Sequence, residues 1–557
     1  MSASDTRPIA STYWQLFIDD HAVARATGFD RVVHHPRAMG VVIPADRPWE
    51  TAGIQPLLVE RRSDESFVCF YTSMWWDIDR AAELGPGFRE DRAHHILHRI
   101  GYAASADGVR WDKPELGLVE APAGIDPAKY APFPAPVGSS TRNNLGVPFV
   151  PVANLGAHGE VSDPARRYAL RLAPEDSAGV GAAWTAAPRG YFASDLPDFL
   201  SDPGWRAKLV DSGGNFNPRR SCLHYWDEIH EEWVAIDQGV VGHWIPSREI
   251  ARFASKDLVN WTSTSVLYPD ALDPHRQDRY DEPMTMVPFC AEGVVFGLLS
   301  WFHSDRTHPD AGPVFDPTPE HPNRWPWCRK GTNEMRITIS RDGGYTWDRA
   351  SSREAWIPHG PEEDSYDRLV IVPVPPVRVG DEDWFYVDVI NGDHLGIRND
   401  PGQTPYYHGR LPRHQIALYV QRHNRYVSLS TQSYAEMLIT TPVEVTGGTL
   451  ELNVDASRGR VRVALAAAEP VPTFNGATPT TAPHMYEGRA LPGFGFDDSP
   501  AVLADAVAHP VAFASGLHAQ IAEPVAFASD LNALRGKPVR LLFEVTNADL
   551  YGFRFRE

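Results

Sequence analysis

The sequence contains little cysteine and no long hydrophobic run. Its four cysteines among 557 residues show no CxxC or cysteine–histidine ligand spacing and sit in or beside apolar stretches. We therefore expect reduced, buried thiols at Cys69, Cys222, Cys290 and Cys328. No stretch of about eighteen apolar residues occurs, and the N-terminal MSASDTRPIASTYWQLF lacks a basic segment followed by an apolar core. We expect a cytoplasmic protein with no membrane partner.

Positive charge is also scarce. Lysine and arginine number 52 against 72 aspartates and glutamates, which leaves a formal net charge of −20. A polyanionic partner needs a basic face, so we expect no nucleic-acid partner. The sequence has no glycine-rich phosphate loop, no GxSxG elbow and no HExxH pair. We expect no cofactor and no metal ion, and the oligomeric state is left open, a homo-oligomer included.

What the sequence does contain is a recurring serine–aspartate–aromatic stretch. ISRDGGYTWDRA at 339–350 has relatives in YAASADGVRWDKPE (102–115), YFASDLPDFLSD (191–202) and RFASKDLVNWTS (252–263). An aspartate at a strand end accepts hydrogen bonds from turn amides, glycine supplies a positive φ, and the aromatic ring packs between sheets. We therefore predict that these stretches are structural turns, not catalytic segments.

Two further strand types lie between these turns. One has a polar start and an apolar body, at 50–60, 142–152, 213–226, 280–289 and 366–376; the other is rich in aromatic residues, at 66–76, 166–173, 231–239, 294–302 and 383–392. Five meanders of short strands predict an all-β chain with a five-bladed β-propeller over 1–431. We expect the strand at 11–23 to close the ring. The hairpin-like segments after 432 predict a separate β-sandwich over 432–557.

With the five units counted, the chain resembles the five-bladed β-propeller glycosidases: the arabinanase, mannoside phosphorylase and invertase groups. A closer likeness, to bacterial proteins labelled as glycosyl hydrolases, covers almost the whole chain through LFIDDHAV (16–23), HHPRAMGVVIPADRPWE (34–50), NNLGVPFV (143–150) and LNVDASRGRVRV (452–463). SRDGGYTW is similar to the Asp-box of sialidases. The invertase signatures are absent, YDEPM (280–284) matches their Glu-Cys-Pro motif only in part, and the sialidase arginine triad cannot be assigned. The resemblance therefore implies the fold more than the catalytic residues.

The polar ends of the innermost strands face a central funnel in a propeller, so they are the candidate site. Glycoside hydrolysis needs one carboxylic acid and one carboxylate. We predict that Glu282, in an apolar neighbourhood, is the general acid, that Glu50 or Asp367 is the base or nucleophile, and that Asp281 lies beside them. The predicted substrate-binding residues on these strand ends and on the loops at the rim are Arg142, Asn143, Asn144, Asp211, Asn215, Arg219, Trp75, Trp76, His243, Trp244, His303 and His394.

These residues predict a glycosidase that acts from the chain end of an oligosaccharide or on a small glycoside. One alternative on the same fold is a phosphorylase, with Arg142, Arg219 and Arg220 as the phosphate site, and another is a lyase with a histidine or tyrosine base. A third is a propeller that binds carbohydrate without catalysis, because one fold hosts many functions.

Overall fold

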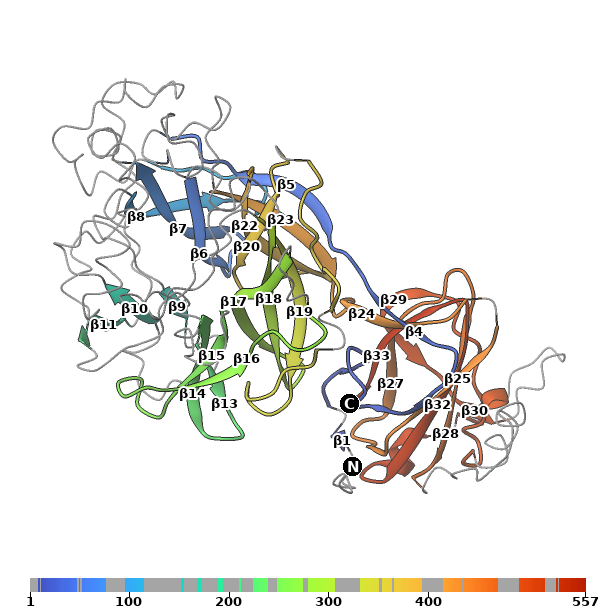
Figure 1. The fold of residues 1–557 in the computed structure, drawn as a ribbon. Coiled ribbons are helices and arrows are strands. Elements are labelled where there is room, and N and C mark those ends of the chain that lie inside the picture. Colours follow the sequence, from blue (N-terminus) through green and yellow to red (C-terminus); the bar gives the residue numbers. More distant parts are fainter. Residues whose placement is uncertain are drawn as a thin grey trace.

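A computed structural model gives the fold of the protein (Figure 1). The residues that the structure describes are 9–10, 12–47, 50, 53–76, 96–114, 152–154, 168–172, 189–193, 210–211, 224–238, 248–273, 279–305, 331–349, 353–362, 365–392, 414–432, 434–468, 490–515, 527–528 and 530–557. Their regular secondary structure is β-strand apart from short 3-10 segments, so the predicted all-β class is confirmed. No helix among them is long and apolar enough to cross a membrane.

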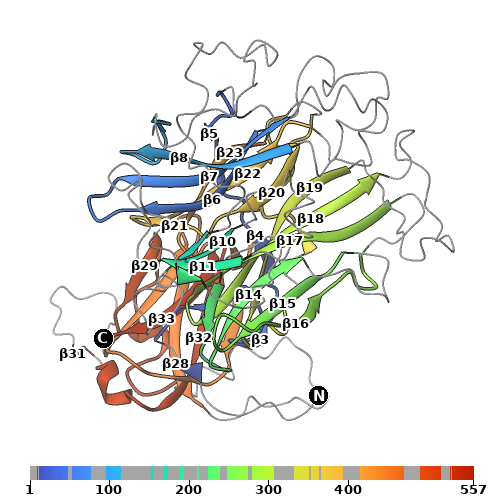
Figure 2. The same cartoon turned by 90° about the vertical axis from the view of Figure 1, so that its left-hand side faces the viewer.

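The described strands of the propeller are β5 (Arg37–Ile43), β6 (Gly53–Arg61), β7 (Phe67–Trp76), β8 (Ile96–Ser105), β9 (Val152–Asn154), β10 (Tyr168–Leu172), β11 (Arg189–Ala193), β12 (Val210–Asp211), β13 (His224–Asp227), β14 (Glu232–Gln238), β15 (Ile250–Ser255), β16 (Thr262–Leu267), β17 (Arg279–Ala291), β18 (Val294–Asp305), β19 (Gly331–Ser340), β20 (Leu369–Pro373), β21 (Val377–Val379), β22 (Glu382–Ile390) and β23 (His414–Arg422). They form five antiparallel groups: β6–β8, β9–β12, β13–β16, β17–β19 and β20–β23. Figure 2 shows these groups fanned beside one another.

Neighbouring groups meet through their first strands and through parallel pairs. β6 contacts both β9 and β20, and β17 contacts β20. β19 pairs in parallel with β20 at Asn333 and Leu369, and β23 pairs in parallel with β6 at His414 and Gly53. The space between β17–β19 and β20–β23 is filled by apolar side chains of both groups, with Phe385 at its centre. This is the propeller arrangement that the repeated units predict.

The ring closes through a different strand from the one predicted. β5 pairs antiparallel with β23, so an N-terminal segment does join the last group, but the segment is 37–43. Residues 11–23 lie elsewhere: β2 (Gln15–Leu16) pairs with β33 (Asp549–Arg556), and β3 (Val23–Ala26) pairs with β25 (Glu436–Thr440). The prediction for 11–23 is wrong because local alternation shows that a segment is a strand but not which sheet it joins.

The C-terminal part is a sandwich of two sheets that also takes in the N-terminus. The remaining elements are β1 (Ile9–Ala10), β4 (Asp30–Val33), β24 (Val427–Ser430), β26 (Val443–Glu444), β27 (Thr449–Asp455), β28 (Arg460–Ala467), β29 (Asp505–Val511), β30 (Ala514–Ser515), β31 (Phe527–Ala528), β32 (Pro538–Thr546) and the short 3-10 helices η12 (Phe496–Asp498) and η13 (Leu531–Leu534). One sheet runs β1-β26-β32-β25-β3 and the other β29-β27-β33-β24-β4. Phe17 lies in the core between them. A boundary at 431/432 therefore needs correction, because β1–β4 and β24 pair with later strands.

Three of the four serine–aspartate turns are structural, as predicted, and the turn of the stretch at 191–202 lies outside the described residues. In the turn after β19, Ser340 accepts the Gly344 N–H at 2.8 Å and Asp342 accepts the Thr346 N–H at 2.8 Å. The turns after β8 and β15 repeat the pattern, since Asp107 and Asp257 each accept two backbone N–H groups. These bonds to the ionised form lower the pKa of both carboxyls.

Each of two such turns also holds the neighbouring group of strands. The Gly343 carbonyl accepts the Tyr225 hydroxyl at 3.0 Å, and the Gly108 carbonyl accepts the Tyr386 hydroxyl at 2.8 Å. Both glycines have positive φ, 70° and 73°, so a side chain there would be strained. The turns therefore join the blades at one rim of the propeller.

The two described cysteines differ. Both are free thiols; Cys69 is buried and Cys290 is exposed. The expectation of burial is confirmed for Cys69 and wrong for Cys290, because Cys290 lies near the end of β17, beside the turn to β18. Cys222 and Cys328 lie outside the described residues.

Candidate active site

The first residues of several strands, which the sequence predicts to form the candidate site, lie along one rim of the propeller. Paired residues form a continuous row along it, called here the rim row: Glu282, Phe302, Asn333, Leu369, Ile390, His414, Gly53 and Met74. Three groups of strands contribute, β17–β19, β20–β23 and β6–β8, through antiparallel pairs within each group and parallel pairs between groups. β17, β19, β20, β23 and β6 therefore begin at one rim, and the serine–aspartate turns lie at the opposite rim.

A chain of four charged side chains lies on β17, β18 and β19 at this rim. His303 Nδ1 is 2.8 Å from Asp281 Oδ2, and His303 Nε2 is 3.0 Å from Glu334 Oε2. Glu334 Oε1 accepts the Nε–H of Arg336 at 2.7 Å. Asp281 is buried, whereas the side chains of His303 and Glu334 keep 15% and 12% of their surface exposed. The middle of this chain can therefore meet a ligand.

The arrangement shifts the pKa of both middle groups. Burial alone would lower the pKa of His303, but hydrogen bonds to Asp281 and Glu334 raise it above its ordinary value. Burial alone would raise the pKa of Glu334, but His303 and Arg336 lower it below its ordinary value. Glu334 is thus an ionised carboxylate held between two cations.

Asp367 is linked to this chain through the segment before β20. The His359 ring lies 6.4 Å from the His303 ring, and the next residue, Gly360, donates its N–H to the Asp367 carbonyl at 2.8 Å. A Cβ on Gly360 would lie 2.4 Å from Asp367 Oδ1, so glycine is needed for this approach. Asp367 is half-buried and accepts the Tyr419 hydroxyl at 3.1 Å. The structure therefore brings Asp281, His303 and Asp367 to one region.

Glu282 is on the rim row, but its carboxylate is already bound. It accepts the Arg248 backbone N–H at 2.8 Å on Oε2 and the Arg248 guanidinium on Oε1. The guanidinium also lies 5.4 Å above the Phe302 ring. Glu282 thus holds an arginine in place at the rim, in addition to any role in catalysis.

Glu50 is enclosed in the protein. Its side chain is fully buried, with Lys113 Nζ at 2.7 Å and the Tyr71 hydroxyl at 2.9 Å. It also accepts the backbone N–H groups of Asp46 and Arg47 at 3.1 Å. Burial raises the pKa of Glu50, and the Lys113 ammonium opposes that shift. In this arrangement Glu50 does not face a ligand and stabilises the segment that leads from β5 to β6.

Several predicted residues have a backbone position only or none. Trp75 and Trp76 end β7 just beyond Met74 of the rim row. Asp211 lies in β12, the fourth strand of its group, rather than at the start of the next group. The others lie outside the described residues and stay predictions: Arg142, Asn143, Asn144, Asn215, Arg219, His243, Trp244 and His394.

Glu334 and Arg336 were not among the residues predicted from the sequence. β19 is a run of buried residues in which Glu334 and Arg336 alternate with the apolar Met335 and Ile337. Charges at alternate positions of a buried strand point to one face and must find partners. That alternation in GTNEMRITIS was the signal available in the sequence.

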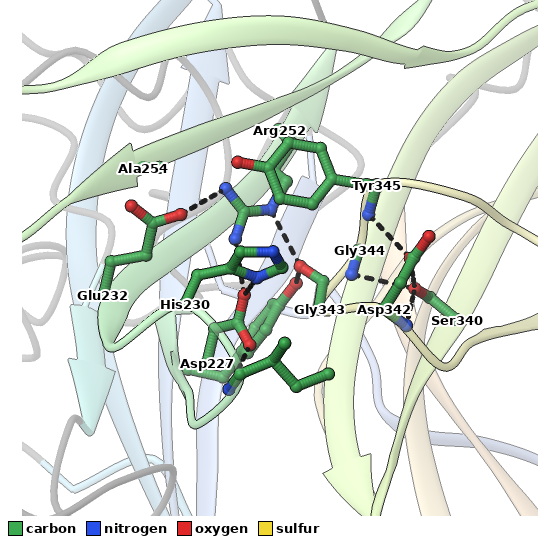
Figure 3. Close-up of polar contacts among 12 residues, drawn as sticks. Asp227, His230, Glu232, Arg252, Ala254, Ser340, Asp342, Gly343, Gly344 and Tyr345 are labelled. Atoms are coloured by element: carbon green, nitrogen blue, oxygen red, sulfur yellow. Dashed lines mark hydrogen bonds and ion pairs between the residues drawn. The ribbon is translucent and has the colours of Figure 1, made fainter. Parts of the chain in front are cut away.

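A second aspartate–histidine–glutamate group lies at the opposite rim. Ligand atoms of Asp227, His230 and Glu232 lie within 4.8 Å of one another, a spacing that could hold a metal ion. Arg252 fills that position instead: its guanidinium lies 2.7 Å from Asp227 and 2.8 Å from Glu232 (Figure 3). Its Nε donates to the Gly343 carbonyl at 2.8 Å. This group ties two blades together, with the Arg252 guanidinium as the cation that its carboxylates bind.

Comparisons with known proteins were made on the sequence and on the fold. No family model matches the sequence, and no curated protein matches it. The chain is similar to solved structures of the mannoside phosphorylase and glycosyl hydrolase groups that the sequence resembles. A β-1,2-mannobiose phosphorylase from Listeria innocua shares 12% identity over 71% of this chain and 91% of that one, with a TM-score of 0.35.

Two more similar structures have comparable scores. A glycosyl hydrolase from Bacteroides ovatus shares 10% identity over 71% of this chain and 95% of that one, with a TM-score of 0.33. A structure from the GH130 family, of mannoside phosphorylases and of hydrolases that target β-1,2 mannosidic linkages in Candida mannan, shares 11% identity over 72% and 95%, with a TM-score of 0.31. Likeness at this level carries no argument about activity.

Proposed function

We propose that the protein is a glycoside hydrolase that cleaves a glycosidic bond in an oligosaccharide or a small glycoside. The observation that carries the proposal is the position of Glu334, a partly exposed carboxylate kept ionised between His303 and Arg336. Glycoside hydrolysis needs such a carboxylate, to attack the sugar or to activate water. Asp281 fixes the His303 ring from behind and so keeps Glu334 in place.

The reaction also needs a carboxylic acid to protonate the leaving oxygen. Glu282 and Asp367 are the two candidates at this rim. Both oxygens of Glu282 accept hydrogen bonds from Arg248, whereas Asp367 is half-buried beside Tyr419. We assign the acid to Asp367 and the task of holding Arg248 to Glu282. This changes the roles predicted from the sequence and leaves Glu50 out of the catalytic set.

The proposal is tested by product analysis on a panel of aryl glycosides and oligosaccharides. We expect a released sugar whose mass corresponds to the addition of one water, and Glu334→Gln should slow its release by about 10²- to 10⁴-fold. Asp367→Asn should lose turnover of oligosaccharides but keep turnover of dinitrophenyl glycosides, whose leaving group needs no proton. If Glu334→Gln and Asp367→Asn both keep full activity on oligosaccharides, the assigned site is wrong.

Arg248 favours one alternative, phosphorolysis. Its guanidinium lies at the rim beside Phe302, and a phosphorylase needs a cation there to bind phosphate. The same panel is therefore run with and without inorganic phosphate. A sugar phosphate as product would replace the hydrolase by a phosphorylase. An unsaturated product would indicate a lyase, and a thermal shift without any product would indicate a carbohydrate-binding protein.

A further inference from the structure

A second aspartate–histidine pair lies on the rim row, in a part of the site to which the catalytic proposal gives no role. His414 Nδ1 is 2.9 Å from Asp388 Oδ1 and 3.0 Å from Oδ2, and Asp388 is completely buried. Gln55 Nε2 donates to Asp388 Oδ2 at 2.6 Å from the neighbouring blade. Burial raises the pKa of Asp388, and His414 and Gln55 oppose that shift because they bind the ionised form.

The Asp388 carboxylate favours the tautomer of His414 that carries the proton on Nδ1; Gln55 Nε2 lies 3.2 Å from the same nitrogen. An ionised carboxylate only accepts hydrogen bonds, so Nδ1 is the donor and Nε2 of the neutral ring has a lone pair. The side chain keeps 21% of its surface exposed. In the part of the chain that the structure describes, no residue forms a hydrogen bond with Nε2. His303, by contrast, uses both ring nitrogens within the protein.

The position of His414 is built into the junction between two blades. His414 pairs in parallel with Gly53 on the rim row, and Gly53 has a φ of 108°. A Cβ at Gly53 would lie 2.3 Å from the backbone nitrogen of His414 and 2.4 Å from its backbone carbonyl oxygen. Glycine at position 53 thus lets the His414 backbone lie directly against β6. The same row leads through Ile390 and Leu369 to Asn333, the neighbour of Glu334.

We propose that His414 is a substrate-binding residue whose Nε2 accepts a hydrogen bond from a hydroxyl group of the bound sugar. Asp388 and Gln55 are positioning residues, which hold the ring with Nε2 toward the ligand. The inference rests on the proposed function and adds to it a recognition contact on β20–β23, the group of strands next to the one that holds His303. A sugar that lacks this hydroxyl group leaves the acceptor unpaired and is bound less tightly.

The test compares His414→Asn with wild type. Asparagine retains a donor for Asp388 near the place of Nδ1 but has no atom in the place of Nε2, so the junction is preserved while the acceptor is removed. The matched control is His230→Asn, because His230 is also paired with an aspartate, at 2.6 Å, but lies at the opposite rim. The probes are methyl glycosides of the common hexoses and pentoses, and binding is measured by calorimetry.

We expect His414→Asn to bind the best methyl glycoside roughly 5- to 10-fold more weakly, the size of one hydrogen bond, with an unchanged melting temperature. His230→Asn should bind as wild type does. A nitrogen-15 spectrum of the histidine rings provides a second readout: Asp388→Asn should shift the His414 ring toward the other tautomer.

The outcomes separate the two proposals. Wild-type turnover together with unchanged glycoside binding by His414→Asn would overturn the role of His414 alone. Absence of both binding and turnover in wild type would overturn the hydrolase and this inference together. The contact would be established if His414→Asn binds the glycoside more weakly and wild type binds one deoxy analogue of that glycoside equally weakly. The hydroxyl group missing from that analogue is then the one that binds His414.

Discussion

Two groups of the same three residue types lie on opposite rims of the propeller. Asp227, His230 and Glu232 come from one hairpin, and Arg252 lies between two of them. Asp281, His303 and Glu334 come from three strands, and Arg336 binds Glu334 at the end of the chain that they form. In the first group the arginine occupies the centre, whereas in the second group the centre is the histidine.

The difference shows why residue types alone do not distinguish a ligand-binding site from a group of ion pairs that only stabilises the fold. Arg252 joins Asp227 to the Gly343 carbonyl of the next blade, and the Tyr345 ring covers it at 4.0 Å (Figure 3). A ligand would have to displace a buried ion pair. Glu334 keeps an exposed edge, and its two cations lower the pKa of its carboxyl, as the proposed catalytic role requires.

The largest expected effect is the difference in turnover between variants of Glu334 and Glu232. Glu334→Gln removes the ionised carboxylate and should lower kcat/KM by about 10²- to 10⁴-fold, the usual contribution of a positioned acid or base. Glu232→Gln removes the same charge at the other rim and should leave turnover by the folded protein unchanged. Steady-state kinetics on one aryl glycoside check both. Equal losses in the two variants would contradict the functional division between the rims.

The second largest expected effect is a loss of stability when the ion pairs at the opposite rim are broken. Arg252→Met leaves Asp227 buried without its cation, and breaking such a buried pair costs about 3–5 kcal/mol. The matched control is Arg458→Met, since Arg458 pairs with Asp549 while 65% of its side chain is exposed, and an exposed pair contributes about 0–1 kcal/mol. Denaturant midpoints of both variants measure the difference. If Arg252→Met loses no more unfolding free energy than Arg458→Met, the ion pairs of Arg252 do not hold the two blades together.

The smallest effect is a pH dependence at the site. The raised pKa of His303 means that its contribution to stability is complete below its ordinary value of 6.5 and is lost as pH rises through the raised value. The lowered pKa of Glu334 means that its contribution is complete above 4.5 and is lost as pH falls through the lowered value. The difference in melting temperature between wild type and His303→Gln should therefore be largest between pH 4.5 and 6.5 and shrink above it. A difference that does not change with pH would refute the ion pair.

Much of the fold could be predicted from local patterns. The alternation of strands and the turns at Asp107, Asp257 and Asp342 follow from residues close in sequence, and so does the polar start of β17 that holds Asp281. The pairing of distant strands could not, which is why 11–23 was assigned to the wrong sheet and Asp211 to the wrong group. Glu50 has the sequence context of a site residue, but its partner Lys113 lies 63 residues away.

The sequence by itself therefore determined the all-β class, the repeated meanders and the turns, because strand alternation and turn chemistry act over a few residues. The tertiary structure alone decided which acids are enclosed and which keep exposed surface at the rim. Glu334 is a candidate because β18 places His303 beside it, and Glu50 is not a candidate because Lys113 and its neighbours enclose its side chain. The ionisation and exposure of a carboxylate depend on neighbours within a few ångströms in space, and the chain supplies those neighbours from distant strands.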